Sequence, residues 1–85
     1  MRGVIKHYLK AEAEYFQAAE RYGKKFELRL NDRDYQPGDI VVLQEMEDGR
    51  FTGRTLRLGE ITYVLEGPIF GLAEGWVIFS WRAKD

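Results

Sequence analysis

Residues 24–30, KKFELRL, carry charged side chains at a spacing suited to binding a polar ligand. Glu27 and Arg29 are two positions apart and share one face of an extended strand, and Lys24 precedes them at the turn into it. A guanidinium offers a planar fork to a phosphate or a base edge, and a carboxylate accepts from an exocyclic amine. These residue types are suited to a site for a phosphate or a base edge. Taken alone, however, they favour a solvated strand face, on which ion pairs contribute little.

The following loop, NDRDYQPGD at positions 31–39, adds further polar candidates. Arg33 is an expected ligand contact, whereas Asn31 and Asp34 are expected to accept hydrogen bonds from nearby backbone amides and so cap the loop. Aromatic side chains in a small domain usually belong to the core, so one or two at most are expected to stack on a base in a pocket. The four candidates are Tyr35, Tyr63, Trp76 and Trp81.

The sequence offers little for a metal or cofactor site. His7 is the only histidine, and cysteine is absent. One histidine without carboxylate partners at ligand spacing does not make a metal site, so a structural hydrogen bond is expected for His7, and no metal or cofactor. No phosphate-binding loop, dinucleotide fingerprint or serine-nucleophile motif occurs.

Length and composition predict one small domain over residues 1–85, with 45% hydrophobic residues, enough for a packed core. The net charge of -1 argues against strong non-specific binding to long nucleic acids. Without cysteine the chain suits a reducing compartment, and the charges in its first ten residues interrupt any membrane span or signal peptide. A cytoplasmic protein without a membrane partner is expected.

The periodicity predicts which elements position these side chains. A helix is expected over residues 11–23, with Tyr15, Phe16, Ala19 and Tyr22 on its apolar side, after a strand at residues 3–9. In residues 24–30 apolar residues recur at every second position, as in a strand with one apolar face. Its apolar residues, Phe26, Leu28 and Leu30, are expected to face the interior.

The remaining chain predicts strands at residues 39–46, 51–67 and 76–81, with a bend at Gly59. Pro37-Gly38 and Asp48-Gly49 are expected to form tight turns. One early helix followed by short, glycine-punctuated strands predicts an α+β fold. Its sheet is expected to be a small β-barrel of five to six mainly antiparallel strands, with the N-terminal helix over an open end or side.

Several segments together resemble a known family. They are His7, Leu9, Lys10, EYF at 14–16, residues 24–45, FTGR at 51–54 and IFGLAEGWVIFS at 69–80. They resemble the ASCH domains of the PUA-like superfamily, and most closely a short bacterial and phage branch of unknown function. The resemblance covers nearly the whole chain, and NDRDYQPGD is its most specific part. The family pattern G-x-K-x-x-E-x-R falls on Tyr22, Lys24, Glu27 and Arg29, with tyrosine in place of the family glycine.

The resemblance implies a PUA-like β-barrel whose helix-to-strand turn and following strand line a cleft for RNA or a nucleotide-like ligand. The residues expected to bind it are Lys24, Glu27, Arg29, Arg33 and Tyr35.

Two other functions stay open. Some ASCH relatives hydrolyse the amide of acetylated cytidine, which would make Lys24 a base or activating group beside Glu27. A lysine must lose its proton for that role; Lys25 favours this and Glu27 opposes it. The catalytic relatives also carry a hydroxyl residue where Glu27 stands, and they are longer. The other alternative is a protein-interaction domain that uses the apolar loop at residues 68–72. The sequence does not determine the oligomeric state.

Overall fold

The computed structural model describes residues 3–84, in which five strands form one mixed sheet beside one helix. The elements are β1 (Lys6–Glu12), α1 (Ala13–Arg21), β2 (Phe26–Leu30), β3 (Ile40–Glu47), β4 (Arg50–Glu66) and β5 (Trp76–Arg82). The strand order is β1-β3-β4-β5-β2, and β1 pairs with β3 in parallel while the other pairs are antiparallel. The predicted α+β class and the early helix are confirmed.

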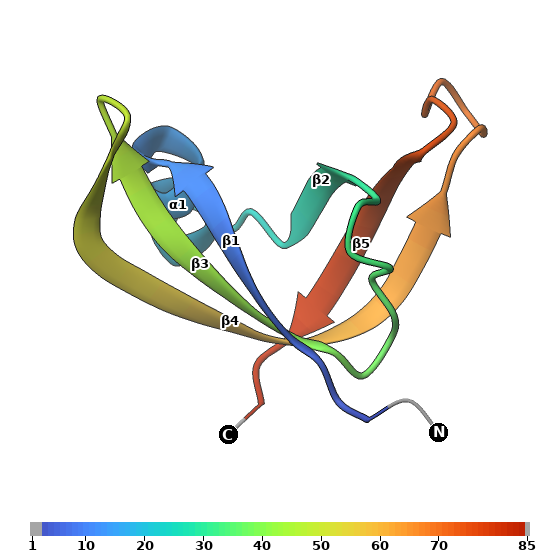
Figure 1. Cartoon of the computed structure of the whole chain (residues 1–85), viewed down its shortest axis with the longest axis horizontal. Helices are drawn as coiled ribbons and strands as arrows, with labels where there is room; N and C mark the ends of the chain where they lie inside the picture. Colours follow the sequence, from blue (N-terminus) through green and yellow to red (C-terminus); the bar gives the residue numbers. More distant parts are fainter. Residues whose placement is uncertain (1–2, 85) are drawn as a thin grey trace.

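The long strand β4 gives the sheet its V shape (Figure 1). Its first half pairs with β3 and its second half with β5, so the two halves belong to different arms. Gly59 lies between them with φ +128°, where a Cβ atom would clash with the backbone carbonyl of Arg82. Only glycine accepts both the dihedral angle and the close approach, which confirms the predicted bend.

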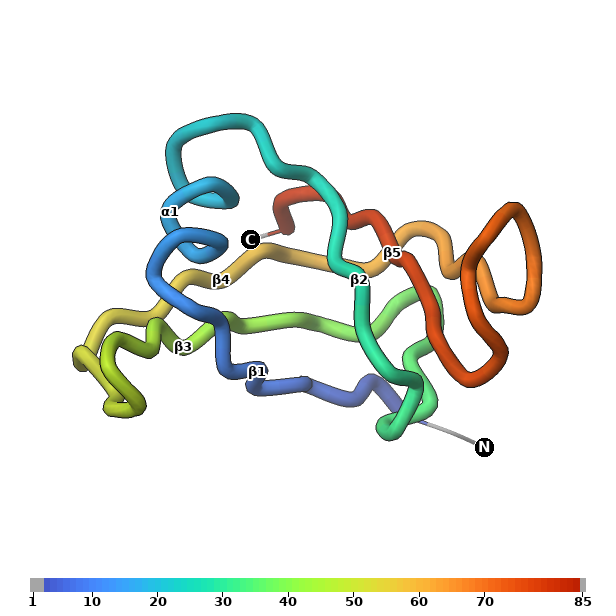
Figure 2. The backbone as a smooth tube through the Cα atoms, turned by 90° about the horizontal axis from the view of Figure 1, so that it is seen from above, coloured from blue at the N-terminus to red at the C-terminus, as the bar shows by residue number. Residues whose placement is uncertain are grey.

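The predicted closure into a barrel is not observed. Within residues 3–84, β1 pairs only with β3 and β2 only with β5, so both strands are edges on the open side of the sheet (Figures 1 and 2). The Arg29 side chain spans this side instead, donating from Nη2 to the carbonyl oxygen of Lys10 at 3.0 Å. A side-chain bridge replaces a backbone ladder here because a pocket separates the two edges.

The core lies between the arms of the sheet. It contains Leu9, Ala11, Phe16, Tyr35, Val41, Leu43, Leu58, Ile61, Val77 and Phe79. From α1 only Phe16 is fully buried, whereas Tyr15 and Tyr22 are exposed, which corrects the predicted apolar side of the helix. A helix of nine residues has little more than two turns to lay against the sheet. No helix in the described part of the chain is long and apolar enough to cross a bilayer.

Strand β2 was predicted with the right period but the wrong orientation. Phe26, Leu28 and Leu30 are each 51% exposed on the outer face, while Glu27 on the inner face is only 4% exposed. Alternation fixes which residues share a face but does not state which face is inside. Burial of the charged face is possible because two cations pair with Glu27.

Both predicted tight turns are confirmed. The amide of Asp39 donates to the carbonyl of Gln36 at 3.1 Å, which closes the turn at Pro37-Gly38. Asp48-Gly49 connects β3 to β4, with Glu47 opposite Arg50. The first strand lies later than predicted, at Lys6–Glu12 in place of residues 3–9, because its pairing with β3 continues to Glu12.

The loop between β4 and β5 contains a two-residue turn between Ile69 and Leu72. Ile69 and Leu72 exchange backbone hydrogen bonds of 3.1 and 2.7 Å, and the residues between them, Phe70 and Gly71, both have positive φ, +48° and +83°. Positive φ at both central positions characterises the type I′ turn, which favours Asn-Gly. Phe70 is 92% exposed, so packing does not offset the conformational cost of its positive φ or the exposure of its ring.

Phe70→Asn is therefore expected to stabilise the fold by about 0.5–1 kcal/mol, because asparagine tolerates the left-handed region better than phenylalanine. Urea denaturation followed by circular dichroism measures this gain. The matched control is Phe51→Asn, which replaces an exposed phenylalanine in β4 without positive φ and should give no gain. Equal effects of the two substitutions would contradict the assignment of strain to Phe70.

Candidate functional site

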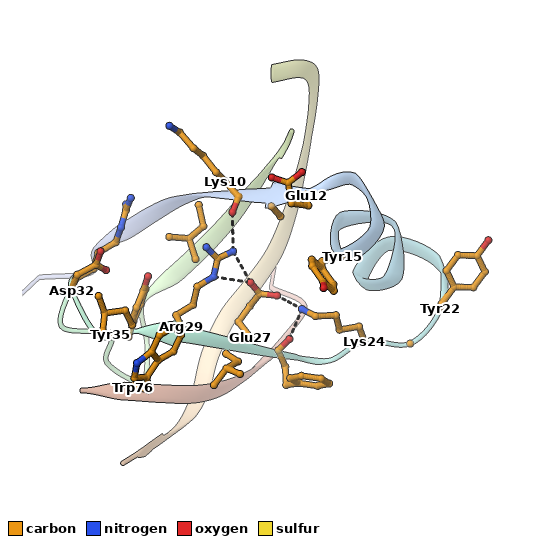
Figure 3. Close-up of a pocket in the computed structure, with 17 residues that line it drawn as sticks. Lys10, Glu12, Tyr15, Tyr22, Lys24, Glu27, Arg29, Asp32, Tyr35 and Trp76 are labelled. Carbon is orange, nitrogen blue, oxygen red and sulfur yellow. Dashed lines mark hydrogen bonds and ion pairs between the residues drawn. The ribbon is translucent and has the colours of Figure 1, made fainter. Parts of the chain in front are cut away.

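A buried carboxylate lies between two cations at the open side of the sheet (Figure 3). One oxygen of Glu27, Oε1, accepts from Arg29 Nη2 at 2.7 Å and from Arg29 Nε at 3.0 Å. The other, Oε2, contacts the ammonium of Lys24. Lys24 and Arg29 retain only small exposed fractions of their side chains. We call Lys24, Glu27 and Arg29 the charged triad.

The local backbone explains why these residues meet. The C-terminal end of α1 holds the chain as it turns toward β2, because the amide of Lys24 donates to the carbonyl of Ala18 at 3.1 Å. The Lys24 side chain then donates to the carbonyl of Phe26 at 2.6 Å and reaches Glu27. Its ammonium also lies 5.8 Å from the centroid of the Trp81 ring, close enough for a cation–π interaction.

The charged triad has donors left for a ligand. An ammonium has three N–H groups, and Lys24 uses two of them, on Phe26 and Glu27. In Arg29 the described contacts engage Nε and Nη2 and leave the two N–H groups of Nη1. Glu27 therefore holds two cations in place, and the cations can donate to oxygen atoms of a ligand.

The triad lies in a pocket of about 1040 Å³ between β1, α1, β2 and the loop after β2. The lining has four basic residues (Lys10, Lys24, Arg29 and Arg33) and three acidic ones (Glu12, Glu27 and Asp32), which leaves one net positive charge. The Lys10 side chain points away from the triad in Figure 3, whereas its carbonyl faces Arg29. The rest of the lining is mainly apolar and aromatic, as in small-molecule sites of other proteins.

Tyr35 forms one wall of the pocket and rests on a buried polar pair. Its ring centroid is 4.8 Å from that of His7 and 5.0 Å from that of Phe79. His7 Nε2 donates to Asp39 Oδ2 at 2.8 Å, so the structural hydrogen bond predicted for His7 is confirmed. Burial raises the pKa of the Tyr35 phenol, which therefore stays neutral at physiological pH.

All five predicted ligand-binding residues line this pocket, namely Lys24, Glu27, Arg29, Arg33 and Tyr35. Of the aromatic candidates, Trp76 also lines it, whereas Tyr63 is exposed outside it and Trp81 packs against the core. Asn31 caps the loop as predicted, because its Oδ1 accepts from the amide of Tyr35 at 3.2 Å.

Other lining residues were missed from the sequence, among them Lys10, Glu12, Tyr15 and Tyr22. Tyr15 and Tyr22 share the helical spacing of a core stripe, so nothing in their pattern marked them as pocket residues. Lys10 contributes through its backbone carbonyl, for which side-chain type gives no signal.

The pocket lies within a segment that matches a known protein family. Residues 6–81, which include every lining residue of the pocket, match the description "Domain of unknown function (DUF3850)". The chain belongs to the DUF3850 family. A relative of this DUF3850 chain is the "Uncharacterized 12.9 kDa protein in GpA 3'region" of Escherichia phage P2, 38% identical over 58 residues. That match covers 66% of the chain and 53% of the relative, so the chain spans about half the length of the phage protein.

Proposed function

We propose that this protein binds a short single-stranded RNA or a nucleotide in the pocket between β1 and β2, using Lys24, Glu27, Arg29, Arg33 and Tyr35. The observation that carries the proposal is the charged triad, in which a buried carboxylate holds two cations with unused donors in a mainly apolar pocket. A phosphate or a base carbonyl supplies the oxygen acceptors that such donors need.

The pocket also has surfaces suited to a planar ring. Tyr15 lines the pocket and is 54% exposed, and Tyr35 lies in the pocket wall on the other side of the charged triad (Figure 3). Single-stranded nucleotides are commonly recognised by stacking on aromatic side chains together with a few hydrogen bonds to a base edge. One net positive charge in the lining favours a ligand of low negative charge over a long duplex.

The finer relationship, to the ASCH domains and their PUA-like barrel, belongs to the same proposal. It is supported by the place of Lys24, Glu27 and Arg29 at a helix-to-strand turn and on the strand that follows, beside a pocket. A ligand in the pocket would fill the open side between β1 and β2, where a closed barrel would have its last pairing.

Hydrolysis of an amide in a modified nucleoside such as acetylated cytidine ranks second. Lys24 is mostly buried and next to a carboxylate, as a catalytic lysine can be. Its ammonium donates to the Phe26 carbonyl and to Glu27, however, and an ammonium has no lone pair for attack or proton abstraction. Turnover of acetylated cytidine that is lost in Lys24→Ala would reverse the ranking.

Arg33→Ala tests the binding function, because Arg33 is exposed at the pocket and is not part of the charged triad. We expect the affinity for a fluorescein-labelled single-stranded RNA to fall roughly three- to tenfold, as for loss of one charged contact. Fluorescence anisotropy measures the affinity, with a nucleoside monophosphate as competitor. With two or three phosphate contacts, the logarithm of the association constant should fall with the logarithm of the salt concentration with a slope of about -2.

The matched control is Arg57→Ala, an exposed arginine of β4 outside the pocket lining, which should bind as the wild type does. Equal losses in Arg33→Ala and Arg57→Ala would indicate diffuse electrostatic attraction and contradict a site in the pocket. Absence of binding to the RNA and the nucleotide by the wild-type protein would refute the proposal.

A further inference from the structure

The outer surface of β2, β5 and β4 carries apolar side chains on each strand, exposed on β2 and partly buried at Ile78 and Leu65. In the β2–β5 ladder Phe26, Leu28 and Leu30 lie opposite Ser80, Ile78 and Trp76. In the next ladder Ser80 and Ile78 lie opposite Tyr63 and Leu65. Residues that are opposite in a ladder share a face. We call this surface, made of Phe26, Leu28, Leu30, Tyr63, Leu65, Trp76 and Ile78, the outer apolar face.

This face is too large to be ordinary scattered exposure. Tyr63 is 64% exposed and Leu28 51%, and both Phe26 and Leu30 match Leu28. With roughly 150–250 Å² for each large side chain, the five most exposed residues offer roughly 400–600 Å² of apolar area. That is the size of the largest patch on a typical monomer, and patches of this size often serve in binding.

We propose that the outer apolar face is the interface of a symmetric homodimer. Two copies packed face to face would cover roughly 800–1200 Å² before any polar rim is counted, which reaches the roughly 1000 Å² that specific interfaces need. In an isologous dimer each face meets itself, so it must not repel its own copy. The central row, Leu28, Ile78 and Leu65, has no charged residue and meets this condition.

Three charges at one border of the face form ion pairs within the chain. Arg82 Nη2 and Lys84 Nζ lie 3.0 and 2.7 Å from Glu60. This cluster carries one net positive charge, which is too little for the neutralisation of several phosphates that strong binding of nucleic acid requires. A second copy of the same face is the partner that this surface fits.

The dimer would also support the pocket, because the outer apolar face borders it, and Phe26, Leu28, Leu30 and Trp76 line the pocket as well. Within residues 3–84, β2 has a hydrogen-bonded neighbour on one edge, which is β5. Its inner face carries Glu27 and Arg29, and its outer face carries the apolar row. Packing a second copy over the outer face would clamp this edge strand and hold the charged triad in place.

Sedimentation velocity over a range of protein concentrations tests the dimer without any ligand, so its outcome is independent of the proposed RNA binding. We expect a reversible monomer–dimer equilibrium for the wild type. Leu28→Lys and Tyr63→Lys should each raise the dissociation constant at least tenfold. Tyr63 lies outside the lining of the pocket, so its variant leaves β2 and the charged triad intact. The matched control, Tyr8→Lys in β1, is 49% exposed on another surface and should dimerise as the wild type does.

A wild type that stays monomeric at millimolar concentration would overturn the proposal. So would a dimer that neither substitution weakens, since its interface would lie elsewhere. A monomer whose RNA affinity falls in Tyr63→Lys but not in Tyr8→Lys would instead assign the face to nucleic acid. Near-ultraviolet circular dichroism confirms that each variant is folded.

Discussion

Glu27→Gln is expected to lower the free energy of unfolding by about 2–3 kcal/mol. Removing one partner of a buried ion pair costs about 3–5 kcal/mol, because the remaining charge is left without compensation. Here the two remaining charges, Lys24 and Arg29, keep some contact with solvent, which reduces the loss. Urea denaturation measures it, and in a domain of this size each kcal/mol corresponds to about 4–8 °C in Tm.

Glu12→Gln is the control, because Glu12 also lines the pocket but is exposed. A double-mutant cycle with Arg29→Gln separates the ion pair from other effects of the substitution. The double variant should lose less stability than the sum of the two single variants, because the second change removes a charge that the first left unpaired. Additive losses, or a Glu27→Gln protein as stable as the wild type, would show that Glu27 does not organise the cations.

Asp39→Ala is expected to cost about 3 kcal/mol, the other large effect. Asp39 is buried, and its Oδ2 accepts from His7 Nε2 at 2.8 Å and from the amide of Gln36 at 3.2 Å. Alanine would leave the buried His7 donor and the partly buried Gln36 amide without this acceptor, and each unsatisfied buried donor costs about 1–3 kcal/mol. Because Tyr35 packs on His7, the wall of the pocket should loosen too.

Asp39→Asn should lose less stability than Asp39→Ala, since an amide oxygen in the place of Oδ2 can still accept both hydrogen bonds, although without the charge of a carboxylate. The exposed Asp32 in the same loop gives the control, and Asp32→Ala should change stability by no more than about 0.5 kcal/mol. Urea denaturation of the four proteins supplies the comparison. If Asp39→Ala and Asp32→Ala were equally mild, the buried pair would not be the anchor of this loop.

The sequence was sufficient for the features that depend on short-range pattern. The helix around Phe16, the period of β2, the turns at Pro37-Gly38 and Asp48-Gly49, and the bend at Gly59 each follow from residue types within a few positions. The clustering of Lys24, Glu27 and Arg29 also followed from local spacing, since a turn and one strand position all three.

The predictions that were wrong concern features that depend on contacts between distant segments. The orientation of β2 depends on whether cations compensate a buried Glu27, which alternation alone does not contain. The open side of the sheet depends on a long-range contact between Arg29 and the backbone of Lys10. Tyr15 and Tyr22 were placed in the core because helical spacing does not reveal how far a helix overhangs its sheet.

The bridge from Arg29 to Lys10 gives the two sides of the pocket unequal freedom. β1 continues directly into α1 and is paired along seven residues with β3, whereas β2 is paired with β5 over only five residues and reaches the opposite side through the guanidinium of Arg29. A ligand oxygen that accepted a hydrogen bond from this guanidinium would compete with the Lys10 carbonyl and release the edge of β2 that faces β1. The width of the pocket opening would then depend on the bound ligand, and the β2 side would adjust more than the β1 side.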